Sequence, residues 1–110
     1  MSQEEAKAMK TAEKWCMVGK TGKVINEFDS FVGEGADPLK LIATLCLYGA
    51  TIGVINHFEE IVFAWGLDPD KAAETMCING GVAEVRQNHG KLVELGVDPV
   101  LIEKYEEDFV

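Results

Sequence analysis

The sequence predicts an all-α protein, with about seven helices arranged as three tandem helix-turn-helix repeats and a C-terminal capping helix. Apolar residues recur at helical spacing along the whole chain, and no stretch alternates as a strand does. A Gly-x-Asp-Pro turn occurs three times, and its copies begin at Gly35, Gly66 and Gly96. Three cysteines recur with the same period, as Cys16, Cys46 and Cys77. Two unrelated markers with one period indicate an internal repeat, and hence a short α-solenoid or a compact bundle.

The first helix of each unit places its apolar residues at i, i+3 and i+4, as in Ala12, Trp15 and Cys16. This spacing forms one helical face. A glycine three residues after each cysteine ends the helix, because glycine adopts the left-handed C′ conformation at little cost. In the first unit, Ser2 and Glu5 form a capping box at the helix start. We expect these helices near residues 3–17, 38–48 and 69–79.

The second helix of each unit carries an inner apolar stripe, which in the middle unit consists of Val54, Phe58, Ile61 and Val62. The string VINEF at 24–28 returns as VINHF at 54–58. In the third unit His89 stands where the other copies have phenylalanine, and we expect a hydrogen-bonded core histidine there. These helices are expected near residues 23–32, 53–65 and 82–95.

The Gly-x-Asp-Pro turn ends one helix and begins the next. Glycine closes the second helix, aspartate caps the following helix, and proline occupies its first position, where no N–H is needed. After the third turn, residues 99–108 form a last helix whose outer face is polar, as a terminal cap requires. Its apolar face consists of Val100, Leu101, Tyr105 and Phe109. We therefore expect one domain over 1–110, with units at about 3–35, 36–66 and 67–96 and a cap at 97–110.

The unit endings FVGEGADP and LVELGVDP resemble those of ankyrin repeats. The resemblance covers the second helix and the turn, and it implies a helical-repeat scaffold that serves protein recognition. Ankyrin units insert a hairpin between this turn and a Thr-Pro-Leu-His helix start. Here the next helix begins at once at the proline, so the hairpin fingers are expected to be missing. Other helix-hairpin repeats fit these features equally well.

The net charge of −9 disfavours direct binding to nucleic acid and to anionic membranes. Residues 1–23 are net +2, residues 24–70 are net −7 and residues 71–110 are net −4. The longest uncharged run, 41–56, is too short for a membrane span, and the charged N-terminus does not resemble a signal peptide. The sequence therefore predicts a cytoplasmic protein whose acidic middle faces a basic partner.

No residue pattern predicts catalysis, a cofactor or a metal site. Three cysteines are an odd number, and at equivalent positions of neighbouring helices they are expected to be reduced, buried and too far apart to share a metal. His57 and Glu60 are one helical turn apart, but no third ligand follows at a matching spacing. We expect His57 at the surface.

We predict a non-enzymatic acidic interaction module, an adaptor or inhibitor that binds a basic surface and, in one version, blocks a nucleic-acid-binding protein. One alternative is a small-molecule-binding regulatory protein with a pocket between repeats. Another is a small enzyme subunit that uses a cysteine or histidine. Trp and Tyr dominate interface hot spots, and the candidate binding residues are Tyr48, His57, Glu59, Glu60 and Trp65. A homodimer through the N-terminal helices is a further expectation.

Overall fold

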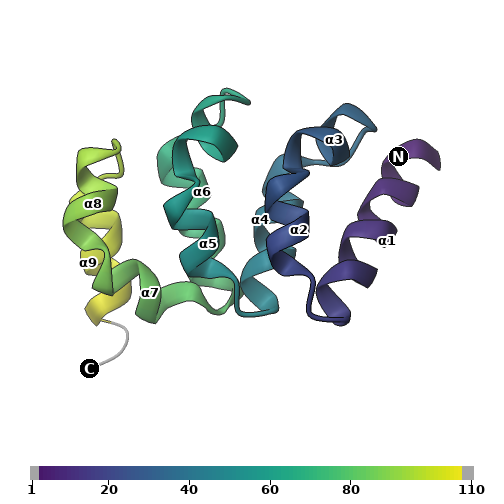
Figure 1. Ribbon diagram of the computed structural model, residues 1–110. Helices are drawn as coiled ribbons and strands as arrows, with labels where there is room; N and C mark the ends of the chain where they lie inside the picture. The colour runs from purple at the N-terminus through teal and green to yellow at the C-terminus, as the bar shows by residue number, and fades with distance from the viewer. Residues whose placement is uncertain (1–2, 108–110) are drawn as a thin grey trace.

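The computed structural model describes residues 3–107 and consists there of helices and turns, without a strand. The prediction of an all-α fold is confirmed. Figure 1 shows the helices stacked in two layers, with the chain running up and down from α1 to α9. In one layer α1, α4, α6 and α9 contact one another in turn, and in the other α2 contacts α5 and α5 contacts α7. Ser2 of the predicted capping box and Phe109 of the apolar face predicted for the last helix lie outside the described residues. The helices are α1 (Gln3–Met17), α2 (Thr21–Asn26), α3 (Phe28–Gly33), α4 (Pro38–Leu47), α5 (Thr51–Asn56), η1 (Glu59–Phe63), α6 (Pro69–Met76), η2 (Cys77–Gly81), α7 (Val82–Gln87), α8 (His89–Glu94) and α9 (Pro99–Glu107).

The prediction of seven helices is wrong in number, because each expected second helix is divided into two. The breaks fall at Glu27, His57 and Asn88, where ψ rises to between 22° and 26°. At two of them a side chain bonds the carbonyl four residues earlier: His57 Nδ1 lies 2.9 Å from Gly53 O, and Asn88 Nδ2 lies 2.9 Å from Glu84 O. Such bonds compete with the backbone ladder and bend a helix. The apolar periodicity of the sequence does not reveal these breaks.

The expected caps form as the sequence predicts. Asp37 and Asp68 each accept a hydrogen bond of 2.9 Å from the N–H two residues later, and Asp98 does the same. Each is followed by proline, and the chain passes from the turn straight into the helix without a hairpin. The six predicted helix-ending glycines all have positive φ: Gly19, Gly35, Gly49, Gly66, Gly80 and Gly96.

These glycines divide the turns between two opposite edges of the molecule. The turns at Gly19, Gly49 and Gly80 lie along the lower edge in Figure 1, and those at Gly35, Gly66 and Gly96 lie along the upper edge. We call these the Gly49 edge and the Gly66 edge. Within η2, Asn79 and Gly80 leave the helical conformation, so this segment is the third turn of the Gly49 edge.

The core runs along the whole stack as one cluster of buried side chains. Its central residues come from the predicted inner faces. They include Ile42 and Leu45 of α4, Val54 of α5, and Phe58, which directly precedes η1. The stripe is less complete in the outer units, where Val32, Val93 and His89 are only half-buried. We expected a hydrogen-bonded core histidine at position 89. The prediction is wrong for the ring nitrogen Nε2, which is buried and has no hydrogen-bond partner.

Candidate functional site

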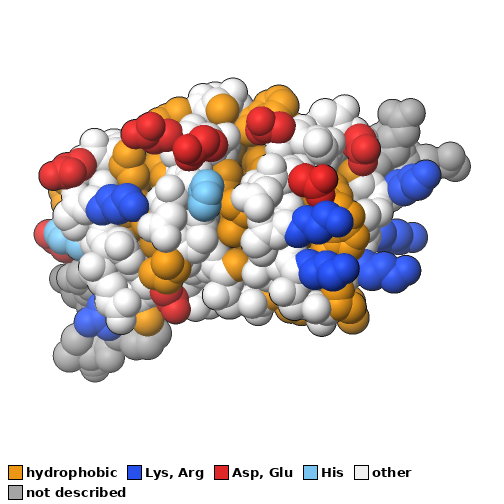
Figure 2. Space-filling model, viewed as in Figure 1, with side chains coloured by type: hydrophobic (Ala, Val, Ile, Leu, Met, Phe, Trp, Pro, Cys, Tyr) orange, Lys and Arg blue, Asp and Glu red, His pale blue; other side chains and the backbone are white. Residues whose placement is uncertain are grey.

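A groove of about 210 Å³ opens between the expected second helices of the first and middle units. In Figure 2 hydrophobic side chains are visible between these two helices on the face toward the viewer. The buried floor consists of Ile25, Phe28 and Ile61. The exposed polar lining consists of Asn26, Asp29, His57 and Glu60.

The polar groups of the groove are rich in hydrogen-bond acceptors. Asp29 and Glu60 each present a carboxylate from opposite walls. His57 donates from Nδ1 to Gly53 O, which leaves Nε2 of the neutral ring as an acceptor. Asn26 adds an amide oxygen. An apolar floor below several acceptors suits a group with a hydrocarbon stem and a cationic N–H-bearing head.

Trp65 joins the two walls at the upper end of the groove. Its Nε1–H donates to Asp29 Oδ1 at 2.9 Å, across 36 residues of sequence. The indole remains 38% exposed. The bond holds the Asp29 carboxylate in place and leaves an aromatic surface beside it, where a cation would gain attraction from the ring.

The position of Trp65 depends on one extra residue in the middle unit. The interval from Cys46 to Gly66 is longer by one position than the intervals from Cys16 to Gly35 and from Cys77 to Gly96. The wide turn η1 absorbs this residue, since Ala64 N donates to Glu59 O five residues earlier at 3.0 Å. Single π-type turns inside helices are often found at functional sites. The longer interval from Cys46 to Gly66 is the signal in the sequence that could have revealed this turn.

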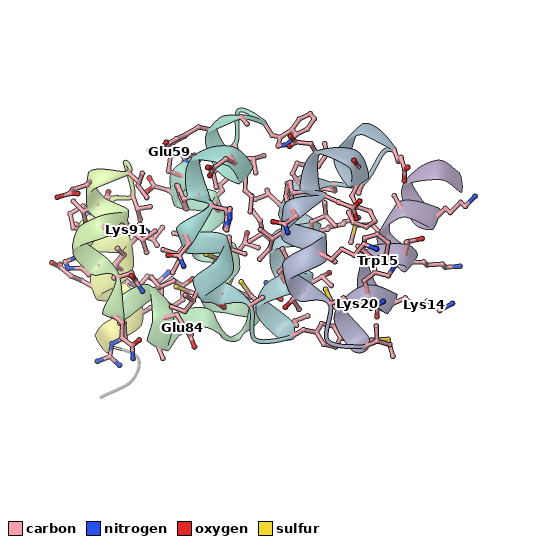
Figure 3. The ribbon with its side chains drawn as sticks, viewed as in Figure 1. Lys14, Trp15, Lys20, Glu59, Glu84 and Lys91 are labelled. Carbon is pink, nitrogen blue, oxygen red and sulfur yellow. The ribbon has the colours of Figure 1, made fainter. Side chains whose placement is uncertain are left out.

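The structure brings together some of the predicted site residues and separates others. His57 and Glu60 both line the groove, and Trp65 adjoins it through Asp29. Glu59 is exposed on the same helix but does not line the groove (Figure 3). Tyr48 ends α4 at the Gly49 edge, opposite the Gly66 edge, and does not line the groove either.

Sequence reasoning missed Asn26 and Asp29. Asn26 belongs to VINEF, but its counterpart Asn56 in VINHF does not line the groove, and Asp29 lies after the string, so the repeated strings contain no signal for either residue.

Charge is distributed unevenly over the face that carries the groove. Figure 2 shows carboxylates along its upper part and a group of lysine side chains on the side of α1 and α2. Lys23 of α2 stands 4.4 Å above the ring of Trp15, which packs edge-on against Phe31 at 5.1 Å. The groove therefore lies beside the acidic part of the face.

The three cysteines are free and buried, as the sequence predicts. Burial, together with the charges of Cys46 and Glu74, raises the pKa of Cys77 to about 11. Burial and the charge of Glu13 raise the pKa of Cys16. For Cys46, burial and the charge of Glu84 raise the pKa against a smaller lowering by a hydrogen bond with Thr51. A raised pKa makes the reactive thiolate scarce at neutral pH.

We therefore expect slow reaction of all three thiols with an aromatic disulfide reagent at pH 8, and three fast-reacting thiols after unfolding.

Because the native state keeps the Cys77 proton, the unfolded state gains relative stability as pH rises from about 8.5 toward the folded pKa of Cys77. Chemical denaturation should show the free energy of unfolding falling over that window, with a smaller slope in Cys77→Ala. Fast stoichiometric labelling of the thiols in the native protein would contradict the burial of the three cysteines.

Across the described residues, no three His, Cys, Asp or Glu side chains lie close enough to hold a metal ion together. None of the helices described is both long and apolar enough to cross a bilayer. No protein-family model matches the chain, and no curated protein and no solved structure matches it. The likeness to ankyrin repeats therefore rests on the turn strings alone.

Proposed function

We propose that this chain is a non-enzymatic acidic interaction module whose groove accepts basic side chains of a partner protein. Its three units are, in this proposal, tandem copies of one helix hairpin stacked as a short solenoid. The observation that carries the proposal is the groove, with Asp29 and Glu60 on opposite walls and Phe28 below them. Repeat scaffolds bind partners along the surfaces that successive units form together.

The chemistry of the groove favours an arginine or lysine side chain. Its methylene stem would cover Phe28 and Ile61, and its head group would meet the two carboxylates. Arginine fits best, because a planar guanidinium bonds carboxylates in pairs and stacks on aromatic rings such as Trp65. Acidic residues outside the groove, Glu59 among them, would steer a basic surface toward it.

The two alternative functions receive less support. The groove volume of about 210 Å³ is below the roughly 300–1,000 Å³ of most small-molecule pockets. It matches one side chain better than a regulatory metabolite. The raised pKa of the thiols opposes a cysteine nucleophile.

A specific version of the proposal is an inhibitor that occupies the nucleic-acid-binding surface of another protein. That surface is basic for any partner that binds phosphates. The acidic upper part of the groove face would compete with the nucleic acid for the same arginines and lysines. A cytoplasmic location, expected from the sequence, is compatible with such a partner.

The test is a titration of isotope-labelled protein with a short arginine-rich peptide, followed by NMR. We expect the largest amide shifts at Asn26, Asp29, His57 and Glu60, and a fall in affinity as salt is raised from about 50 to about 200 mM. The double variant Asp29→Asn, Glu60→Gln should bind about 10- to 100-fold more weakly, since a charge-assisted hydrogen bond contributes about 1.5–3 kcal/mol.

Glu103→Gln is the matched control, because Glu103 is exposed on α9 and its loss also changes the net charge by one. Combined with Glu94→Gln it matches the charge change of the double variant. We expect less than a threefold effect from this control pair. Equal losses from both pairs, or shifts spread evenly over all acidic residues, would contradict a specific groove.

A further inference from the structure

A row of exposed apolar side chains follows the Gly49 edge, away from the groove. Met17, Leu47 and Ile78 each come directly after a cysteine, and they are 65%, 66% and 66% exposed. Val18 and Tyr48 extend the row and are 64% and 42% exposed. Large apolar side chains are thus exposed along one edge, and clusters of exposed apolar side chains mark interaction surfaces.

The charges beside this row change from one end of the molecule to the other. Within seven residues of Met17 there are four lysines and one glutamate, whereas within seven residues of Ile78 there are two glutamates and one lysine. Around Leu47, in the middle, the stretch 41–56 is uncharged. Figure 3 shows Lys14 and Lys20 near this edge at the α1 end, and Glu84 near the same edge at the α7 end.

A second copy of the chain complements this pattern. If two copies meet edge to edge around a two-fold axis through the Leu47 region, the lysines of the α1 end of each lie beside Glu74 and Glu84 of the other. This charge contact then forms twice, and the apolar middle packs on itself. An isologous contact of this kind closes at two subunits.

A dimer contact of standard size would need only a modest part of the molecular surface. The row extends along the long dimension of the molecule, which measures 40 Å. A standard interface covers about 800 Å² per partner. The accessible surface of the chain is 6200 Å², so such a contact would take roughly one-eighth of it.

We propose that the Gly49 edge is a homodimer interface formed by Met17, Leu47, Tyr48 and Ile78. This interface replaces the contact expected through the outer side of the first helix. There Met9 is half-buried and Trp15 packs on Phe31, so only Met17 of the apolar residues expected on that side is strongly exposed. None of the four proposed interface residues lines the groove.

Light scattering at about 50 μM tests the proposal on the full chain. We expect twice the monomer mass of 12.0 kDa. Leu47→Lys should weaken dimerisation about 100-fold or more, because two like charges would meet near the axis. Val100→Lys is the matched control, since Val100 is 67% exposed but begins α9 at the opposite edge. Circular dichroism should show equal helix content in both variants.

A charge exchange tests the orientation of the two copies. Lys14→Glu with Lys20→Glu should weaken the dimer about 10-fold, and adding Glu74→Lys should restore part of that loss. A monomer mass at the same concentration would overturn the proposal, whether or not the protein then binds phosphatidylcholine vesicles through the apolar row. A dimer unaffected by Leu47→Lys would also overturn it. Peptide binding in the groove should be the same in monomeric Leu47→Lys, so failure of this proposal is separable from failure of the groove.

Discussion

Replacing Val62 with aspartate is expected to unfold the protein. Val62 belongs to η1, is 0% exposed and lies in the continuous core of the middle unit, with a unit on either side. A carboxylate there would be removed from water without a partner, which costs several kcal/mol. Because small domains have a total stability of about 5–15 kcal/mol, most of the folded population should be lost. Far-ultraviolet circular dichroism and thermal melting would measure the effect.

Asn56→Asp is the matched control, because it introduces the same side chain in the same region. Asn56 is exposed, and its Oδ1 accepts from Lys91 Nζ at 3.3 Å. A carboxylate would keep this contact as an exposed ion pair, which contributes at most about 1 kcal/mol. We expect a melting temperature close to that of the original chain. Similar melting temperatures for the two variants would refute the assignment of an inner and an outer face.

The second large effect is expected from Gly81→Ala, at the start of α7, where it contacts α5. A Cβ atom at Gly81 would lie 2.7 Å from both Cγ2 and Oγ1 of Thr51 and 2.9 Å from the carbonyl oxygen of Met76. Thr51 is buried, and the Met76 oxygen belongs to the backbone, so neither can move away freely. Overpacking of this kind costs about 1–3 kcal/mol. The melting temperature should fall by about 5–20 °C.

Gly90→Ala is the opposite case within the same unit. A Cβ atom there meets nothing within 4 Å, and Gly90 lies inside α8 without positive φ. Alanine should therefore stabilise the helix by about 0.5–1 kcal/mol. If both substitutions lower the melting temperature equally, the close approach at Gly81 does not govern the packing of α7 on α5.

The candidate site was only partly predictable. His57 and Glu60 were found because they are one helical turn apart, a relation within one helix. Asp29 was missed because its partners come from the next unit, and only the packing of α2 and α3 beside α5 brings it to Trp65. Tyr48 was grouped with Trp65 as an aromatic candidate, but Tyr48 ends α4 at the Gly49 edge, whereas Trp65 precedes Gly66 at the opposite edge.

The sequence by itself determined the helix ends at the turns, but not the breaks at Glu27, His57 and Asn88. The caps at Asp37 and Asp68 and the left-handed glycines act within a few residues, so local chemistry decides them. The inner faces were also readable, because burial imposes the helical period on apolar residues. Only the tertiary structure decided how the extra residue between Cys46 and Gly66 is accommodated, which is by the wide turn η1. It also decided the position of Trp65, whose indole N–H donates to Asp29. The groove, the Trp65–Asp29 hydrogen bond and the contact at Gly81 depend on distances between segments far apart in sequence, and those distances are set by side-chain packing.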